Sequence, residues 1–484
     1  MSEHSVGKAE NFLKDGEMRR LDLNGTAVLL SRVEGQYHAV AGDCAHYGAH
    51  LDEGVLKGHT LICPWHHACF DVRSGLRREP PALNDLAHFP VHIHAGEVVV
   101  ILPQDNDVEP QGKATDLNPQ TFVIIGGGAA GNSAAEELRR AGYRGKIVLL
   151  SDVANVPIDR PNLSKDYLAG NADPAWMPLR DAAWYADRDI DLQLNTTVTG
   201  VDPKAHHVML ENGGTLGYDV LLLATGGVPR QLDVPGKDLA NVFLLRKLAD
   251  ADQIIEAGGA SKQVVIIGAS FIAMEAAASL ASGRGLTVTI VGIEAVPFER
   301  VLGRDIGLML QKEHEDNGIQ FRLNAGVKQF FGKDGVVNSV ELSSGEVLLA
   351  DFVLVGVGVR PATDFLNGSG LKLNDKDKSV LVDSSLLTSD PAIYAAGDIA
   401  RYDNAGSSVR IEHWRVAQQQ GILAARNMNG GNDRVQYHVP FFWTHQWNIE
   451  LRYVGHAEQW DEIIYRNGTP EQKKFVAFFV AGGN

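Results

Sequence analysis

Short apolar runs separated by turn residues fill the first hundred residues of the chain. The segments with this pattern are "TAVLLSRV" (26–33), "YHAVAG" (37–42), "TLICP" (60–64) and "VHIHAGEVVVILP" (91–103). Their length and their content of β-branched residues are typical of strands. We therefore predict an all-β domain over residues 1–103.

The pattern changes at residue 104. Residues 104–119 show no apolar periodicity, which predicts an exposed linker that would span about 20–25 Å as a coil. Beyond it, buried apolar runs such as "TFVII" (121–125) and "QVVII" (263–267) each precede a helical pattern. A strand followed by a helix, repeated along the chain, predicts doubly wound α/β domains with parallel sheets.

Composition limits the possible classes of protein. The 484 residues are too many for one core and correspond to about three or four domains. The net charge of −16 argues against nucleic acid or an anionic membrane as partner, because both need a basic face. The polar start "MSEHSVGKAE" is not a secretory signal, and the longest apolar runs are too short to span a membrane. Three cysteines cannot build a disulfide framework, so we expect a cytoplasmic location.

Two of the cysteines belong to Cys/His pairs in loops that contain Gly or Pro. One residue separates Cys44 from His46, and after sixteen further residues two residues separate Cys63 from His66. Zinc would accept these four side chains, but its usual spacing places both cysteines in one pair and both histidines in the other. One Cys and one His from each loop suit a two-iron cluster, in which one iron takes both cysteines and the other both histidines.

The pattern C-x-H, sixteen residues, C-P-W-H resembles the signature of Rieske domains, and the resemblance covers residues 10–103. It implies that a 2Fe-2S cluster is held by two cysteines on one iron and two histidines on the other, namely Cys44, Cys63, His46 and His66. The family usually has Gly where this chain has His67, so we expect the backbone to approach the cluster differently. The first loop lacks the bridging cysteine of respiratory-complex Rieske proteins and is similar to the soluble Rieske ferredoxins. Cys69 is predicted to be a small buried hydrophobe. A metal-free docking module is the alternative.

A dinucleotide fingerprint follows the first buried run of the α/β region. Gly126-x-Gly128-x-x-Gly131 lies between a strand pattern and a helix pattern, where the glycines permit a tight turn and let backbone amides reach a pyrophosphate. Asp152 follows the next strand, "KIVLL", at the position of a ribose-binding acid. Taken alone, Asp152 could equally be a surface acid.

A second fingerprint, Gly268-x-Ser270-x-x-Ala273, has small residues in place of two glycines. The strand after it, "LTVTIV", leads to Glu294, which is the candidate ribose ligand for a nicotinamide cofactor. No arginine stands directly at that strand end to bind a 2′-phosphate. This favours NADH over NADPH.

The order of "LLLATGGVPR", "VGVGVRPATDF" and "IYAAGDIARY" around the two fingerprints resembles flavoproteins with two dinucleotide-binding domains, FAD on the first and a nicotinamide cofactor on the second. Arg160-Pro-x-Leu-Ser-Lys165 stands where disulfide reductases have two cysteines. It resembles the ferredoxin reductases that serve oxygenases and the apoptosis-inducing factor family. The cofactor-binding residues that the resemblance implies are Gly126, Gly128, Ala130, Gly131, Asp152, Arg160, Lys165, Ala224, Thr225, Gly226, Gly268, Ser270, Glu275, Glu294, Gly358, Gly397, Asp398 and Trp414.

Three of these residues are implied to act in catalysis. The resemblance places Lys165 against the flavin, Glu275 near the nicotinamide and Trp414 along the flavin wall. Gly397 and Asp398 would face the ribityl or pyrophosphate part of FAD, together with backbone amides and a helix dipole. The alternatives are a solvated lysine and a core tryptophan.

The resemblance also divides the chain. It implies a Rieske domain (1–103), a linker (104–119), an FAD domain in two parts (120–236 and 363–436), an NAD(P)H domain (237–362) and a small α+β C-terminal interface domain (437–484). The last domain ends in "FVAFFVA", a strand pattern, and "GGN", a hairpin turn with no strand after it. We therefore expect the natural protein to continue beyond residue 484.

The interpretation of the whole chain is an electron-transfer enzyme. It would pass electrons from NADH through FAD to the Rieske cluster and on to an external one-electron acceptor such as an oxygenase or a cytochrome P450. A homodimer is compatible with the sequence. The alternative is an NADH-sensing redox switch like apoptosis-inducing factor, in which turnover is incidental.

Overall fold

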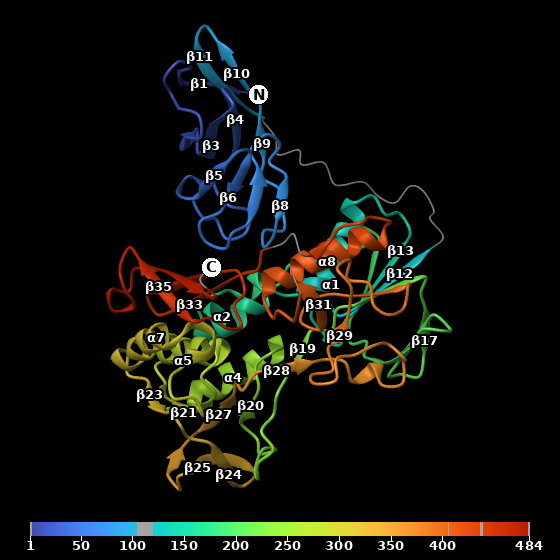
Figure 1. Cartoon of the computed structure of the whole chain (residues 1–484), viewed down its shortest axis with the longest axis vertical. Helices are drawn as coiled ribbons and strands as arrows, with labels where there is room; N and C mark the ends of the chain where they lie inside the picture. Colours follow the sequence, from blue (N-terminus) through green and yellow to red (C-terminus); the bar gives the residue numbers. More distant parts are fainter. Residues whose placement is uncertain (1, 104–119, 405, 436–438, 483–484) are drawn as a thin grey trace. The chain divides into compact units, whose positions relative to one another are not determined.

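The computed structural model describes residues 2–103, 120–404, 406–435 and 439–482. The chain divides into two compact units, Met1–Thr115 and Asp116–Asn484 (Figure 1). The predicted linker, residues 104–119, lies outside the described residues, and the division falls within it. Each unit is considered by itself.

The first unit is built from β-strands, as predicted. Its described strands form three antiparallel sheets: β1 (Ser2–Lys8), β11 (Glu97–Leu102) and β10 (Val91–His94); β2 (Met18–Leu23), β3 (Thr26–Val33), β4 (Gln36–Ala41) and β9 (His88–Phe89); β5 (Val55–Lys57), β6 (Thr60–Ile62), β7 (Cys69–Asp71) and β8 (Arg77–Glu79). In β3, Val28 and Leu30 belong to one core cluster and Leu29 to another. Successive side chains of a strand point to opposite faces, so β3 is covered on both sides.

The second unit contains two parallel sheets, which confirms the doubly wound prediction. Counting described residues, each has five strands: β14 (Ile190–Gln193), β13 (Lys146–Leu150), β12 (Thr121–Ile125), β18 (Val220–Leu223) and β30 (Ile393–Ala395) in the first; β20 (Val242–Phe243), β27 (Phe352–Val355), β21 (Gln263–Ile267), β22 (Thr287–Val291) and β23 (Gln320–Arg322) in the second. Every neighbouring pair runs parallel. Ligands of such sheets bind beyond the carboxyl ends of the strands, which is where the two fingerprints lie.

Helices α1 (Ala129–Arg140) and α8 (Trp414–Met428) pack against each other beside the first sheet (Figure 1). Their close approach depends on Gly421, since a Cβ there would lie 2.1 Å from the carbonyl oxygen of Ala130. Helix α5 (Phe271–Arg284) follows the second fingerprint. The other described α-helices are α2 (Asp166–Ala169), α3 (Ala182–Ala186), α4 (Leu248–Ala260), α6 (Glu299–Leu302) and α7 (Arg304–Asp316).

Smaller antiparallel sheets complete the second unit. They pair β15 (Val198–Asp202), β16 (His207–Leu210) and β17 (Thr215–Gly217); β24 (Val327–Lys333), β25 (Val336–Leu342) and β26 (Val347–Leu349); and β19 (Gly227–Pro229) with β28 (Val359–Pro361). A further sheet is mixed: β29 (Val380–Leu381) runs parallel to β31 (Ala400–Asn404), which pairs antiparallel with β32 (Ser407–Val409).

Two hairpins form the C-terminal region: β33 (Phe441–Gln446) with β34 (Ile449–Val454), and β35 (Glu462–Arg466) with β36 (Val476–Val480). The strand predicted from "FVAFFVA" is therefore the second strand of a hairpin. Of the helices that the structure describes, none has the length and apolar content needed to cross a membrane.

Candidate functional site: a cluster site and two cofactor pockets

The two Cys/His loops of the first unit have the same backbone design. The amide of Cys44 donates to the carbonyl of Ala49, and the amide of Cys63 donates to the carbonyl of Ala68, each over 2.8 Å. In each loop, the amide of the cysteine is thus hydrogen-bonded to the carbonyl of the residue five positions later, and this bond closes the loop. This shared turn brings the histidine of each loop beside that of the other.

The four predicted ligands converge as two like pairs. The thiols of Cys44 and Cys63 are buried and hydrogen-bonded to each other, and this bond, together with burial, raises the pKa of Cys44. The Nδ1 atoms of His46 and His66 lie 3.1 Å apart. Burial, and the neighbouring His66, lower the pKa of His46 to about 3, so the ring is neutral and its Nδ1 lone pair can serve as a donor.

This donor set fits a two-iron cluster better than a single metal ion. Across residues 2–103 and the other described ranges, no group of three or more His, Cys, Asp and Glu side chains is arranged to hold one ion. A structural zinc takes four ligands from the protein. A Rieske cluster brings its own bridging sulfides and needs only two cysteines on one iron and two histidines on the other. The paired arrangement provides those donors.

His67 occupies a left-handed backbone conformation, with φ of +65°. Glycine adopts this conformation without a Cβ penalty, whereas other residues lose about 1–2 kcal/mol there. The loop therefore keeps the backbone geometry that suits the glycine usual at this position. Cys69, the third cysteine, is buried, with its thiol 3.4 Å from the carbonyl oxygen of His67.

In the second unit, the glycines of the first fingerprint serve different purposes. Gly126 has φ of +111°, and a Cβ there would lie 2.3 Å from the carbonyl oxygen of Ala224. A Cβ on Gly131 would lie 1.9 Å from the carbonyl oxygen of Gly126. Gly128 is different, because a Cβ there would meet only the Arg160 side chain, at 3.7 Å. Gly126 and Gly131 are needed for the turn itself, and Gly128 leaves the pocket open.

A pocket at the carboxyl end of the first sheet gathers most of the predicted FAD residues. Those that line it are Gly128, Ala130, Arg160, Lys165, Ala224, Gly226, Glu275, Gly397, Asp398 and Trp414. Thr225 lies beside it and donates its hydroxyl to the carbonyl of Ala362 over 2.8 Å. The amide of Gly397 donates to the side chain of Gln420 over 2.7 Å, so this amide is already paired. Asp152 does not line the pocket; its exposed carboxylate forms an ion pair with Lys247 at 2.9 Å.

Lys165 and Glu275 form a buried ion pair on the pocket wall. The Lys165 Nζ lies 2.8 Å from Oε2 of Glu275, whose side chain is only 5% exposed. The hydroxyl of Ser164 donates to the same carboxylate over 2.6 Å, and that of Thr444 over 2.7 Å. One carboxylate therefore joins the segment after the first fingerprint, helix α5 and the C-terminal strand β33.

Two arginines, Arg160 and Arg246, line the flavin pocket, and the sequence interpretation missed Arg246. Burial, reinforced by the nearby Arg246, lowers the pKa of Arg160 to about 10. Arg246 donates to Asp398 over 3.1 Å, while its buried Nε has no hydrogen-bond partner among the described residues. A diphosphate is a natural acceptor for unpaired guanidinium donors. The pocket therefore fits FAD. Arg246 belongs to no sequence motif and lies two residues before helix α4.

A second pocket lies at the carboxyl end of the second sheet and contains Gly268, Ser270, Glu294 and Gly358. A Cβ on Gly268 would lie 2.4 Å from the carbonyl oxygen of Gly356, and the Ser270 hydroxyl donates to that carbonyl over 3.0 Å. The Oε2 atom of Glu294 is buried and has no partner in the part of the chain that the structure describes. This acceptor fits the hydroxyls of a ribose.

Arg300 of helix α6 also lines this pocket. NADH was favoured over NADPH because no arginine stands at the end of the strand before Glu294. The fold brings a cation, Arg300, to the pocket from another part of the sequence. The preference for NADH remains a prediction.

The two pockets share a wall. The side chains that line both are Phe271, Val301, Glu412, His413 and Phe442. His413 lies between them, its ring centroid 4.8 Å from that of Phe442. Burial, with His456 nearby, lowers the pKa of His413 to about 4. A flavin in the first pocket and a nicotinamide in the second would thus meet across a boundary that includes the apolar side chains of Phe271, Val301 and Phe442.

Comparisons with known proteins identify the family and the domains of the chain. Residues 120–421 match the family described as pyridine nucleotide-disulphide oxidoreductase, residues 3–90 the Rieske [2Fe-2S] domain, and residues 441–484 the reductase C-terminal domain. The chain is 35% identical to apoptosis-inducing factor 3 of Homo sapiens over 97% of this chain and 78% of that protein. It is 35% identical to rhodocoxin reductase of Rhodococcus erythropolis over 75% of this chain and 84% of that protein.

Solved structures show the same likeness. The covalent putidaredoxin reductase–putidaredoxin complex aligns with a TM-score of 0.72 and 33% identity, over 76% of this chain and 88% of the matched chain. The ferredoxin reductase for the CYP199A2 system of Rhodopseudomonas palustris aligns with a TM-score of 0.71 and 32% identity, over 75% and 89%. The chain belongs to the pyridine nucleotide-disulphide oxidoreductase family and is an FAD-dependent NAD(P)H oxidoreductase with an N-terminal Rieske domain.

Proposed function

We propose that this oxidoreductase takes electrons from NADH at the shared wall, passes them through FAD to its own Rieske cluster, and delivers them singly to an external acceptor protein. The observation that carries the proposal is the presence in one chain of two adjoining cofactor pockets and a complete set of cluster donors. Bound FAD accepts two electrons at once and can release them singly, and the cluster accepts one.

The residues of the chain supply orientation and charge. Arg160 and Arg246 would hold the diphosphate of FAD, and Glu294 the ribose of the nicotinamide cofactor. The Lys165–Glu275 pair would place a positive charge beside the reacting end of the flavin. The apolar wall of Phe271 and Phe442 would keep water from the site of hydride transfer.

The class of acceptor protein that we propose is inferred from the relatives of this chain. Among them are reductase components of biphenyl and anthranilate dioxygenase systems, and the reductase of the putidaredoxin complex. By analogy we propose an oxygenase or a cytochrome P450 system as acceptor, in the cytoplasm, where thiols stay reduced. A homodimer belongs to the same proposal and is tested by the mass of the protein in solution.

A single-turnover experiment tests the order of transfer. Anaerobic protein is mixed with one equivalent of NADH, and flavin absorbance and the electron paramagnetic resonance signal of the reduced cluster are followed. We expect the flavin to bleach first and the cluster signal to rise as the flavin reoxidises. A cluster that stays oxidised while the flavin is reduced would contradict the proposal.

The redox-switch function is the second candidate, favoured by the match to apoptosis-inducing factor 3 along nearly the whole chain. A switch should keep a long-lived, air-stable reduced flavin–nicotinamide complex. An electron-transfer enzyme should reoxidise rapidly in the presence of a one-electron acceptor such as cytochrome c. The reoxidation rate with and without that acceptor separates the two.

A further inference from the structure

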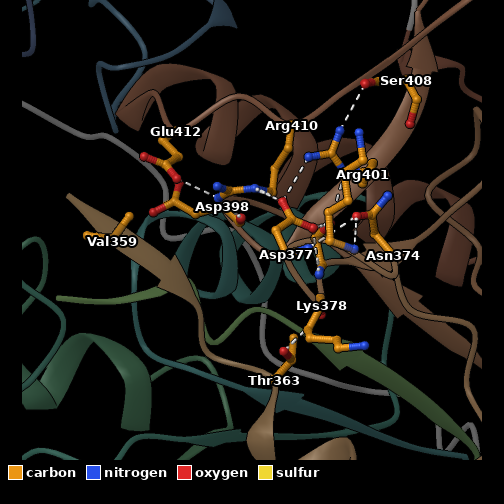
Figure 2. Close-up of polar contacts among 12 residues, drawn as sticks. Val359, Thr363, Asn374, Asp377, Lys378, Asp398, Arg401, Ser408, Arg410 and Glu412 are labelled. Carbon is orange, nitrogen blue, oxygen red and sulfur yellow. Dashed lines mark hydrogen bonds and ion pairs between the residues drawn. The ribbon is translucent and has the colours of Figure 1, made fainter. Parts of the chain in front are cut away.

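A network of charged side chains runs from the loop of Asp377 through Arg410 to Glu412, which lines both pockets (Figure 2). Its centre is Asp377, in the loop between Asn374 and Ser379, whose ends are joined by a hydrogen bond from the Asn374 amide to the Ser379 carbonyl over 2.8 Å. Asp377 does not line either pocket. Its carboxylate accepts hydrogen bonds from Arg401 over 2.8 Å and from Arg410 over 3.0 Å.

The two arginines use Asp377 differently. Arg401 makes its remaining contacts with the Ser379 hydroxyl, over 3.0 Å, and the Ser408 carbonyl, over 2.9 Å. These contacts stay within the loop and the sheet of β29, β31 and β32. Arg401 therefore fastens the loop and touches neither pocket.

Arg410 reaches from Asp377 to the pocket walls and itself lines the second pocket. Its Nη1 donates to the backbone carbonyl of Asp398 over 2.9 Å and lies 2.6 Å from Oε1 of Glu412. Asp398 lines the flavin pocket, and Glu412 lines both pockets. The Arg410 side chain is only 13% exposed, so its position is fixed by these three partners.

We propose that Arg410, anchored by Asp377, is a positioning residue for hydride transfer: it holds the Glu412 carboxylate and the Asp398 turn in fixed register where the nicotinamide and flavin pockets meet. The proposal rests on the assignment of those two pockets. A planar guanidinium suits this role because its fork of donors can bind a carboxylate on one side and two further acceptors on the other.

The charges around Glu412 agree with this role. Burial raises the pKa of the Glu412 carboxyl, and Arg410 opposes that rise, although 39% of the side chain faces the open pockets. Burial works against the Asp377 carboxylate too, but hydrogen bonds from Ser379 and Arg401 outweigh it and hold its pKa below the usual range. Asp377 is thus a fixed anion that orients Arg410, and Arg410 in turn holds the Glu412 side chain along the wall.

The test compares Arg410→Gln with Arg401→Gln in the full-length, FAD-loaded protein. Both variants remove one cation from Asp377, but only the first releases Glu412. The measurements are FAD content, the dissociation constant for NAD⁺ by calorimetry, and the rate of flavin reduction by NADH in stopped flow. We expect Arg410→Gln to retain FAD and to lower the reduction rate about tenfold, the order for one lost charge-assisted hydrogen bond, with weaker NAD⁺ binding. Arg401→Gln should lower the reduction rate less than Arg410→Gln does, because Ser379 still donates to Asp377 and Arg410 keeps its contacts with Asp398 and Glu412.

Equal effects of the two substitutions, or an unchanged reduction rate in Arg410→Gln, would overturn the proposal. Should Arg410→Gln lose its flavin, Asp377→Asn decides, because it keeps the side-chain volume and removes only the anchoring charge. The same slow reduction with FAD retained supports the proposal, and loss of FAD in this variant as well contradicts it. A wild-type protein that NADH does not reduce would instead refute the proposed function.

Discussion

The ammonium of Lys165 lies 2.8 Å from the carboxylate of Glu275, although 110 positions separate the two in the sequence. A buried charge is costly unless it is paired, and removal of one partner leaves the other uncompensated. Glu275→Gln should therefore lower the free energy of unfolding by about 3–5 kcal/mol, even though glutamine can still accept from Ser164 and Thr444. Chemical denaturation of the FAD-loaded protein measures this loss.

An exposed pair of the same kind is the control for that loss. Lys237 and Asp233 form an ion pair at 2.9 Å on the surface, where solvent screens it. Asp233→Asn should leave the denaturation midpoint unchanged. Equal losses in the two variants would mean that the Lys165–Glu275 pair contributes no more than a surface contact.

The glycines of the first fingerprint predict two different failures. In Gly128→Val the new Cβ would have only the Arg160 side chain within 4 Å, so the variant should fold, while its side chain occupies the flavin pocket and excludes FAD. In Gly131→Val the Cβ would lie 1.9 Å from the Gly126 carbonyl oxygen, so the turn itself should be disrupted. FAD absorbance and the thermal unfolding midpoint separate the two. Full FAD occupancy in Gly128→Val would show that the fingerprint is misread.

Glu294 should contribute to nicotinamide binding. Glu294→Ala removes an unpaired buried acceptor and is expected to weaken NADH binding by about 1 kcal/mol, as for a charge-assisted hydrogen bond in a partly exposed site. Gly292→Ala should act in the same direction, because its Cβ would lie 2.9 Å from the Glu294 carboxylate and displace it. Titration with NADH and with NADPH is the measurement. If Glu294→Ala binds both cofactors as wild type does, Glu294 is not the ribose ligand.

The pairing of the cluster donors predicts the metal content. Because each loop gives one thiolate and one imidazole, purified protein should contain about two irons per chain and little zinc. Elemental analysis together with acid-labile sulfide determination checks both. Zinc in place of iron would contradict the Rieske assignment.

The sequence predicted the elements of this fold better than their contacts. The strands around both fingerprints and the run 26–33 were predictable, because apolar periodicity and glycine spacing are local signals. The all-β and doubly wound classes followed from them. The glycine positions also predicted where the pockets lie, since ligands of parallel sheets bind at the carboxyl ends of the strands.

Contacts between distant segments could not be predicted in the same way. Arg246, Arg410 and Asp377 belong to no motif, and the fold alone brings them to the pockets or into contact with residues that line them. Asp152 is a further example: no sequence pattern indicated its ion pair with Lys247, and its role as a ribose ligand stays a prediction. Side-chain partners of this kind depend on tertiary placement, which no local pattern encodes.

The central claim is that electrons reach the external acceptor through the cluster. Cys44→Ser replaces a soft thiolate ligand by a hydroxyl that is a poor iron ligand at neutral pH, so the cluster should be lost. The flavin pocket belongs to the other compact unit, so FAD should stay bound and NADH should still bleach it. Cys69→Ser is the matched control, because Cys69 is also buried in the first unit but is not among the predicted ligands.

The most direct measurement is the NADH-driven rate with two acceptors, ferricyanide, which can meet the flavin, and a bulky one-electron acceptor protein. We predict that Cys44→Ser keeps the ferricyanide rate and loses the rate with the protein acceptor, while Cys69→Ser keeps both. If Cys44→Ser reduces the protein acceptor as fast as wild type, the Rieske domain is not in the electron path and the account is wrong.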